Sequence, residues 1–241
     1  SLVTLSPEAF DDFSAHHADG NFQQTSAAGR LRAGQGIEVE YLGVQENGTI
    51  VAGALFETHR SRLSTFSVVH DGPLCDYRDR ELTEYFMTQL KQHAKAKGSA
   101  QMEIVPEMPY CLHDSRGGEL PADQGGAPAD DAVETLKNLG FMHDGFTIGY
   151  TAVPRWRYLK DLTDITDEKS LLKSYDKRTQ WSVKRAASMG VHVRELGEDE
   201  LQVFADIEQA TAERRNFEYR GEAYFRKFKQ AYGSKAHFMV A

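Results

Sequence analysis

IEVEYLGVQENGTIVAGALFETHR, residues 37–60, is the stretch that decides the fold of the first half of the chain. Two runs of apolar and β-branched residues flank Asn47-Gly48, a pair that favours the positive φ angles of a tight hairpin turn. We therefore predict two antiparallel strands joined at this turn. LSTFSVVH, residues 63–70, predicts a third strand, which ends at the turn DGPL.

Helices are predicted on both sides of this hairpin. Residues 6–16 predict a short helix that Ser6 caps and that Pro7 opens, and residues 20–36 predict a loop and a short helix. Residues 79–97 carry apolar side chains at helical spacing and end at Gly98. Further along, the sequence predicts a strand at 101–106, an exposed loop at 112–130, a helix at 131–140 and one or two strands within 141–153.

This order of elements indicates an α+β fold with helices on a mostly antiparallel sheet. It is compatible with an acetyltransferase-like (GNAT) domain over residues 1–153, although many α+β folds share the same pattern. In residues 154–241 we predict helices at 167–188, 198–214 and 221–231, with strands at 191–196 and 235–241. Since the sequence stops within the last strand, we expect this second domain to be truncated and the natural protein to continue.

Composition and charge exclude several classes of protein. The 241 residues have a formal net charge of −8, which argues against non-specific nucleic-acid binding. Residues 151–241 hold 17 Lys and Arg against 14 Asp and Glu, which leaves 11 against 22 for residues 1–150. The second half is therefore weakly basic and suited to an anionic ligand, although solvated surface charge explains the same distribution.

The chain has no sequence feature of an exported or membrane-spanning protein. Its first residues have neither the basic nor the apolar region of a signal peptide, and no apolar run approaches the ~18 residues of a membrane span. Cys75 and Cys111 are too few for a disulfide framework or a zinc site and are typical of packing thiols in a reducing compartment. We therefore expect a cytoplasmic protein.

Cationic side chains supply the candidate binding residues. In the helix from Lys173 to Arg185, basic residues seven apart share a face, which suits a phosphate or diphosphate ligand. The alternative is a solvated face balanced by nearby acidic residues. Arg30 and Arg32 follow a stretch of small residues that matches neither a Walker loop nor a dinucleotide fingerprint.

A second group of candidates lies near the C-terminal end. Arg214 and Arg215 fall in the last turn of a predicted helix, where cations are favoured in any case. Tyr219, Tyr224 and Phe225 suit ligand stacking, although aromatic residues here are more often part of a core. The sequence contains no nucleophile elbow, zinc-protease helix, Cys-x-x-Cys pair, kinase motif or acetyl-CoA loop.

Several of these segments, in this order, resemble the FemABX family. In the first half they are NFQQTSAAGRLR, FSVVHDGPLCDY, MEIVPEMPY and LKNLGFMHDGFTIGY. The second half matches more densely, at Arg155-Trp156, Asp161-Leu162, the basic helix, Gly190-Val191, Thr211, Arg214, Arg215, Phe217 and Tyr224-Phe225. Three positions depart from the family pattern, because Asp71, Val105 and Trp181 stand where the family often has Arg, Asp and Arg.

The resemblance implies an aminoacyltransferase built from two GNAT-like domains, 1–153 and a truncated 154–241. Family members transfer an amino acid from aminoacyl-tRNA to the stem peptide of a peptidoglycan precursor, which is lipid II or a UDP-linked muramyl pentapeptide. The reaction implies no cofactor and no metal, and peripheral contact with the inner face of the membrane is compatible with a lipid-linked acceptor. The catalytic base stays unassigned.

The site residues follow from the same resemblance. We expect Arg32, Arg178 and Lys184 to contact acceptor phosphates, and Thr179 and Tyr224 to line the cleft. Arg30 is a further candidate for binding the substrate. Arg214 and Arg215 are candidates for the acceptor end of the tRNA. Three alternatives remain open at this point, namely a non-catalytic binder of cell-wall precursor, a GNAT-type N-acyltransferase with another donor, and an aminoacyl-tRNA:protein transferase.

Overall fold

The computed structural model describes residues 1–145 and 156–241. The chain divides into two compact units, Ser1–Gly145 and Phe146–Ala241, which are described separately below. The predicted boundary between residues 153 and 154 lies outside the described residues, and so does most of the segment 141–153, for which we predicted one or two strands. Both therefore stay predictions.

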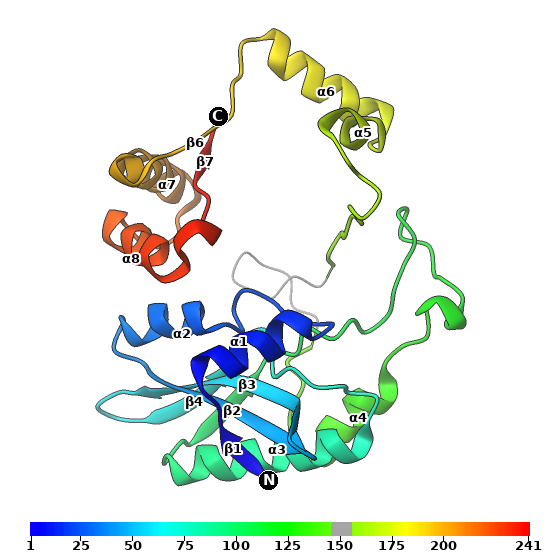
Figure 1. The fold of residues 1–241 in the computed structure, drawn as a ribbon, viewed down its shortest axis with the longest axis vertical. Helices are drawn as coiled ribbons and strands as arrows, with labels where there is room; N and C mark the ends of the chain where they lie inside the picture. Colours follow the sequence, from blue (N-terminus) through cyan, green and yellow to red (C-terminus); the bar gives the residue numbers. More distant parts are fainter. Residues whose placement is uncertain (146–155) are drawn as a thin grey trace. The chain divides into compact units, whose positions relative to one another are not determined.

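The first unit contains a five-stranded sheet in the order β1-β2-β3-β4-β5 (Figure 1). Neighbouring strands are antiparallel except β4 and β5, which are parallel, so the prediction of a mostly antiparallel sheet is confirmed. The first strand was not predicted, because three residues are too few to show an alternating pattern. The strands are β1 (Leu2–Thr4), β2 (Glu38–Glu46), β3 (Thr49–Arg60), β4 (Thr65–Val69) and β5 (Gln101–Ile104).

The predicted hairpin between β2 and β3 is present. Asn47 and Gly48 have φ angles of 50° and 83°, as its turn requires, and Glu46 pairs with Thr49 directly beside it. A register shift between Val44 and Gln45 marks an irregularity in β2. The turn chemistry therefore fixes the register of the two longest strands of the sheet.

Helices cover both faces of this sheet, α1 and α2 on one side and α3 and α4 on the other (Figure 1). Ser6, Thr25 and Asp79 cap the first three of them, since each side chain accepts a hydrogen bond from a main-chain N–H in the first turn. The helices are α1 (Pro7–His16), α2 (Ser26–Ala33), α3 (Arg80–Ala96) and α4 (Asp130–Asn138), and a short 3₁₀ turn, η1 (Ala122–Gln124), precedes the last.

Alternation along β3 divides its side chains between the two helical layers. Ala54 and Phe56 enter the main core with Phe86 and Leu90 of α3, all of them at most 2% exposed. Each of the buried Phe and Leu side chains contributes about 1.5–3 kcal/mol by leaving water. The intervening residues point to the other layer, which places the polar part of β3 beneath α2.

The second unit holds two separate groups of elements. The single helix predicted for 167–188 is wrong, because the chain forms α5 (Glu168–Lys173) and α6 (Lys177–Ser188). Asp176 causes the break, since its carboxylate accepts from the N–H groups of Arg178 and Thr179 and so starts a new helix. Within α5 and α6 no residue is buried.

The remaining elements of the second unit share a small core. It contains Leu201, Ala205, Phe225 and Phe238, each less than 9% exposed. The elements are β6 (Arg194–Glu195), η2 (Glu198–Glu200), α7 (Leu201–Arg215), α8 (Glu222–Tyr232), η3 (Gly233–Lys235) and β7 (Met239–Val240). The two strands pair with each other in antiparallel fashion and are shorter than predicted.

Candidate functional site

A buried carboxylate at the end of β3 is the centre of the candidate site in the first unit. Glu57 is fully buried, and burying a charged carboxylate is costly unless charged and polar groups surround it. Arg32 of α2 supplies the opposite charge, with its Nε 2.6 Å from Oε1 of Glu57. The second guanidinium contact is to Gln23, whose Oε1 accepts from Nη2 at 2.8 Å. The ion pair therefore fastens α2 to the sheet.

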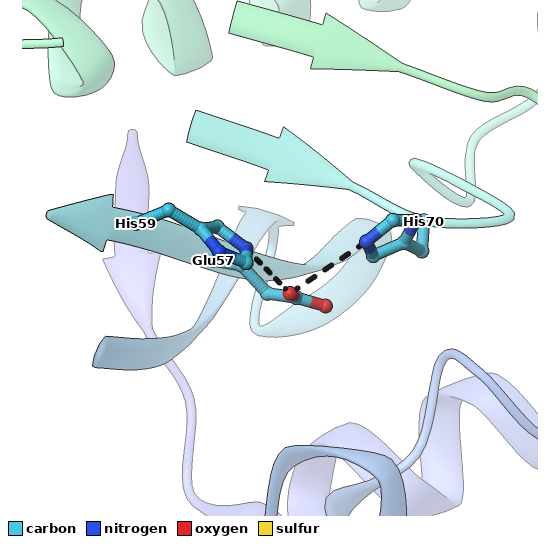
Figure 2. A group of neighbouring side chains, drawn as sticks. All are labelled: Glu57, His59 and His70. Carbon is cyan, nitrogen blue, oxygen red and sulfur yellow. Dashed lines mark hydrogen bonds and ion pairs between the residues drawn. The ribbon is translucent and has the colours of Figure 1, made fainter. Parts of the chain in front are cut away.

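Two histidines approach the other oxygen of Glu57 (Figure 2). Oε2 lies 3.0 Å from Nε2 of His59, two residues along the same strand face, and 3.7 Å from Nε2 of His70. His59 stacks on Phe66 of β4, with ring centroids 4.7 Å apart. The side chain of His70 is 43% exposed, so solvent reaches the cluster from that side.

The turn that carries His70 is held by side chains from the loop before α2. Gln24, which is fully buried, donates to the main-chain oxygen of His70 and accepts from the N–H of Leu55. Asn21 donates to the main-chain oxygen of Asp71 at 2.8 Å. A Cβ on Gly72 would lie 2.8 Å from the Gln24 amide, so this close approach requires glycine. The turn is therefore fixed in place before any ligand binds.

Val105, one of the departures noted above, also meets this turn. Its N–H donates to the main-chain oxygens of Val69 and Gly72, at 3.1 and 3.0 Å. The end of β5 is thus joined to the end of β4 through the main chain. An apolar side chain at this position supplies no catalytic carboxylate.

Of the two arginines predicted in the first unit, Arg32 is the more engaged within the protein. Its side chain is 14% exposed and bonded to Glu57 and Gln23. Arg30, one helical turn after Ser26, is exposed and donates to the hydroxyl of that serine at 3.0 Å. The geometry therefore gives Arg32 a structural role within the unit and leaves Arg30 the more accessible cation.

The basic helix α6 presents its predicted residues at the surface. Arg178 and Lys184 are exposed, whereas Thr179 is half-buried and donates its hydroxyl to Asp176 at 2.7 Å. Hydrogen bonds from the hydroxyl and the N–H of Thr179 lower the pKa of Asp176. Thr179 therefore acts first as part of the helix cap.

Arg178 and Lys184 are six residues apart, so their side chains project about 120° apart around the helix axis. The pairs that do share a face are separated by seven residues. One of these, Arg178 and Arg185, includes a residue whose guanidinium lies 5.0 Å from the ring of Trp181. The helix thus spreads its positive charge over a wide surface instead of focusing it on one point.

The predicted residues near the end of the chain lie on α7 and α8. Arg214 and Arg215 occupy the last turn of α7, which ends at Asn216 with a φ angle of 56°, and both are exposed. Tyr224 packs against the core of the second unit, and its hydroxyl accepts from Arg220 at 2.9 Å. The ring of Tyr224 therefore packs in part against the core, in agreement with the alternative that aromatic residues here belong to a core.

Glu57, His59 and His70 are not among the site residues predicted from the sequence. The signal was available in part, since a carboxylate two residues before a histidine interrupts the apolar run of a predicted strand. What could not be inferred was the partner, because Arg32 lies 25 residues earlier and reaches Glu57 only through the packing of α2 on the sheet.

The fold of the chain matches that of a solved structure. The crystal structure of FemX matches with a TM-score of 0.72 at 23% sequence identity, over 96% of this chain and 54% of that chain. At this level of identity the match concerns the fold alone. The match supports an α+β fold over most of the chain.

A model of the FemAB family matches residues 5–241, and the chain belongs to that family. It is 28% identical over 236 residues to the aminoacyltransferase FemA of Staphylococcus epidermidis, covering 96% of this chain and 56% of the relative. For FemA of Staphylococcus aureus the identity is 29% over 230 residues, with 93% and 53% covered. The chain thus spans about half the length of the curated relatives it matches.

A helix that crosses a lipid bilayer must be long and apolar. None of the helices in residues 1–145 and 156–241 combines the length and the apolar character that spanning a membrane needs.

Proposed function

We propose that this chain is part of an aminoacyl-tRNA-dependent transferase that adds an amino acid to the stem peptide of a peptidoglycan precursor, forming the interpeptide bridge. The observation that carries the proposal is the FemAB family match over residues 5–241. The relatives named FemA are aminoacyltransferases, which supports the same class of reaction here. The donor would be aminoacyl-tRNA, and the acceptor lipid II or a UDP-linked muramyl pentapeptide, met in the cytoplasm or at the inner face of the membrane.

The proposed domain organisation follows the same match. Two GNAT-like domains, with the second incomplete, would correspond to residues 1–153 and 154–241. The first unit has an α+β fold, with helices on both faces of its five-stranded sheet, and this supports a GNAT-like first domain. The small core formed by α7, α8, β6 and β7 supports a second domain.

The proposed chemistry makes modest demands on the protein. An amine attacks the activated ester of the donor, so the enzyme gains most by positioning the two substrates and by stabilising the oxyanion. The acceptor amine must also lose a proton, for which a weak base is sufficient. This accounts for a family member without a catalytic triad motif in its sequence.

We assign the acceptor phosphates to exposed cations. Arg30 in the first unit, and Arg178 and Lys184 on α6, are exposed and of the right charge. Because Arg178 and Lys184 point to different sides of α6, each would contact a different part of the acceptor. Thr179 and Tyr224 would line the acceptor site, with their hydroxyls already oriented by Asp176 and Arg220.

Charge reversal tests the acceptor assignment. The double variant Arg178→Glu/Lys184→Glu is expected to weaken binding of the UDP-linked muramyl pentapeptide, measured by calorimetry, by at least about tenfold. Lys95→Glu/Lys137→Glu is the matched control, since it changes the net charge equally at exposed positions of the first unit. Equal affinity of the two double variants for the acceptor would remove the phosphate role of α6.

Arg214 and Arg215 are assigned to the tRNA. Both are exposed at the end of α7, where they add positive charge to the weakly basic half of the chain. Replacing both by Gln should lower tRNA affinity and reduce the dependence of log K on log salt by about 0.7–0.9 for each lost phosphate contact. An unchanged salt slope would exclude them from the tRNA interface.

The transfer reaction itself is tested with the full-length natural protein, pooled radiolabelled aminoacyl-tRNAs and lipid-linked muramyl pentapeptide. Label that moves to the acceptor supports the proposal and identifies the amino acid. Label that moves to a polypeptide N-terminus instead indicates an aminoacyl-tRNA:protein transferase. An acceptor that binds without gaining label indicates a non-catalytic binder, and transfer from an acyl-CoA indicates a GNAT-type enzyme.

A further inference from the structure

The cluster of Glu57, His59 and His70 has the residue types and the spacing of a metal centre. One ligand atom from each side chain lies within 4.8 Å of the other two. The three side chains converge from β3 and from the turn after β4, as Figure 2 shows. We propose that this cluster binds a divalent transition-metal ion of the Zn²⁺ type.

The spacing of the ligand atoms supports the proposal. Ligands about 2.0–2.1 Å from a tetrahedral zinc ion are about 3.3–3.4 Å from one another. Oε2 of Glu57 lies 3.0 Å from Nε2 of His59 and 3.7 Å from Nε2 of His70, on either side of that value. The ligand atoms of the two histidines lie within 4.8 Å of each other, so an ion fits among the three atoms after the side chains adjust.

Each ligand is also held in position by a neighbour that does not belong to the cluster. Arg32 bonds Oε1 of Glu57, the ring of Phe66 stacks on His59, and Gln24 holds the main chain of His70. Partners of this kind fix the orientation of metal-binding side chains and maintain their affinity. The cluster is thus arranged in advance of binding, which keeps the entropic cost of binding low.

The donor set decides which ion is expected. Two imidazoles and one carboxylate are typical of zinc and related transition metals, whereas magnesium and calcium prefer sites made of oxygen atoms. Three protein ligands leave the fourth coordination position of the ion open to water or to a bound small molecule. The exposed side of His70 gives that position access to solvent.

Arg32 opposes the ion without excluding it. A carboxylate has about four lone-pair sites, so Oε1 of Glu57 can stay bonded to Arg32 while Oε2 binds a metal ion. The guanidinium is nevertheless a positive charge next to a second cation, and it lowers the affinity of the site. We therefore expect reversible binding of Zn²⁺ rather than permanent retention.

The test uses the whole chain after dialysis against a chelator. Titration with Co²⁺, followed by its visible d–d absorption, and with Zn²⁺, followed by calorimetry, is expected to show one saturable site. Zn²⁺ should also raise the thermal midpoint, since an ion that binds only the folded state stabilises it. Absence of saturable binding up to about 1 mM metal would overturn the proposal.

Variants locate the ion. His59→Gln and His70→Gln should each weaken Co²⁺ binding by at least about tenfold. His93→Gln is the matched control, because His93 forms a similar contact with Glu40 at 2.9 Å. Among the described residues, His93 does not belong to a group of three possible metal ligands. Circular dichroism confirms that each variant is folded. Binding that survives both substitutions in the cluster, or that is lost in the control, would also overturn the proposal. The outcome does not depend on the transfer reaction, because only metal binding is measured.

Discussion

Gln24 is bonded to His70 across 46 residues of sequence, through its side-chain amide and the main-chain oxygen of the histidine. The other end of the same amide accepts from the buried N–H of Leu55 at 2.8 Å. One fully buried side chain thereby joins the loop before α2, the middle of β3 and the turn after β4. The candidate site owes its shape to this connection.

Replacing Gln24 by Met tests that role. The substitution keeps the length of the side chain but leaves the N–H of Leu55 without its partner, so unfolding free energy should fall by about 1–3 kcal/mol. Urea unfolding provides the measurement. Gln45→Met, at an exposed position of β2, is the control and should change stability by less than about 0.5 kcal/mol. Equal effects of the two substitutions would contradict the role of the bridge.

The pair of Arg32 and Glu57 gives a second prediction. Arg32→Met leaves a fully buried carboxylate without its cation and should cost about 3–5 kcal/mol of stability. Adding Glu57→Gln removes the charge and should restore a large part of the loss, which urea unfolding of the double variant measures. A single variant as stable as the wild type would mean that Arg32 is available for a ligand instead.

The elements that sequence predicts well are those with a local signal. The hairpin depends on Asn47-Gly48, and the helix α3 depends on apolar spacing that ends near Gly98, so both follow from neighbouring residues. The helix predicted across 167–188 failed at Asp176, because a capping carboxylate competes with helix continuation and periodicity alone does not register it.

The candidate site needed information that is not local. Arg32 was predicted as a ligand contact because the family resemblance places a basic residue after this segment, yet it faces the buried Glu57. That pairing depends on which side chains of β3 point toward α2, and therefore on the register of the whole sheet. His70 joins the same cluster through a long-range contact of its turn with Gln24. Such contacts are settled by tertiary packing, which a single sequence does not reveal.

The charged contacts of Lys97 predict how stability varies with pH. Burial by itself raises the pKa of Glu40, but hydrogen bonds from Lys97 and His93 outweigh it and leave that pKa lowered. A lowered carboxyl pKa adds stability above the unfolded value of about 4.3, and this is lost as pH falls through the folded value. Hydrogen bonds from Glu38 and Glu40 raise the pKa of Lys97, whose contribution is lost as pH rises beyond about 10.4.

Lys97→Met should therefore flatten the stability curve at both ends of the pH range. Urea unfolding between pH 3 and pH 11, approximately the span of these titrations, measures the effect. Lys95→Met, at an exposed position in the last turn of α3, is the control and should leave the curve as it is in the wild type. The interpretation fails if the free energy of unfolding of the two variants falls in the same way as the pH is lowered.

The two thiols should differ sharply in reactivity. Burial raises the pKa of Cys75 to about 12, whereas Cys111 is half-buried with its Sγ 3.8 Å from Nδ1 of His113. Since the thiolate is the reactive form, a pKa of about 12 reduces the reactive fraction at pH 8 roughly a thousandfold relative to an ordinary thiol. Alkylation of the native protein should label Cys111 alone, and Cys111→Ser should abolish labelling until urea unfolds the first unit. The contrary result would be that Cys75 in the folded Cys111→Ser variant is labelled as fast as in urea. That result would show that the core around α3 opens far more readily than its packing implies.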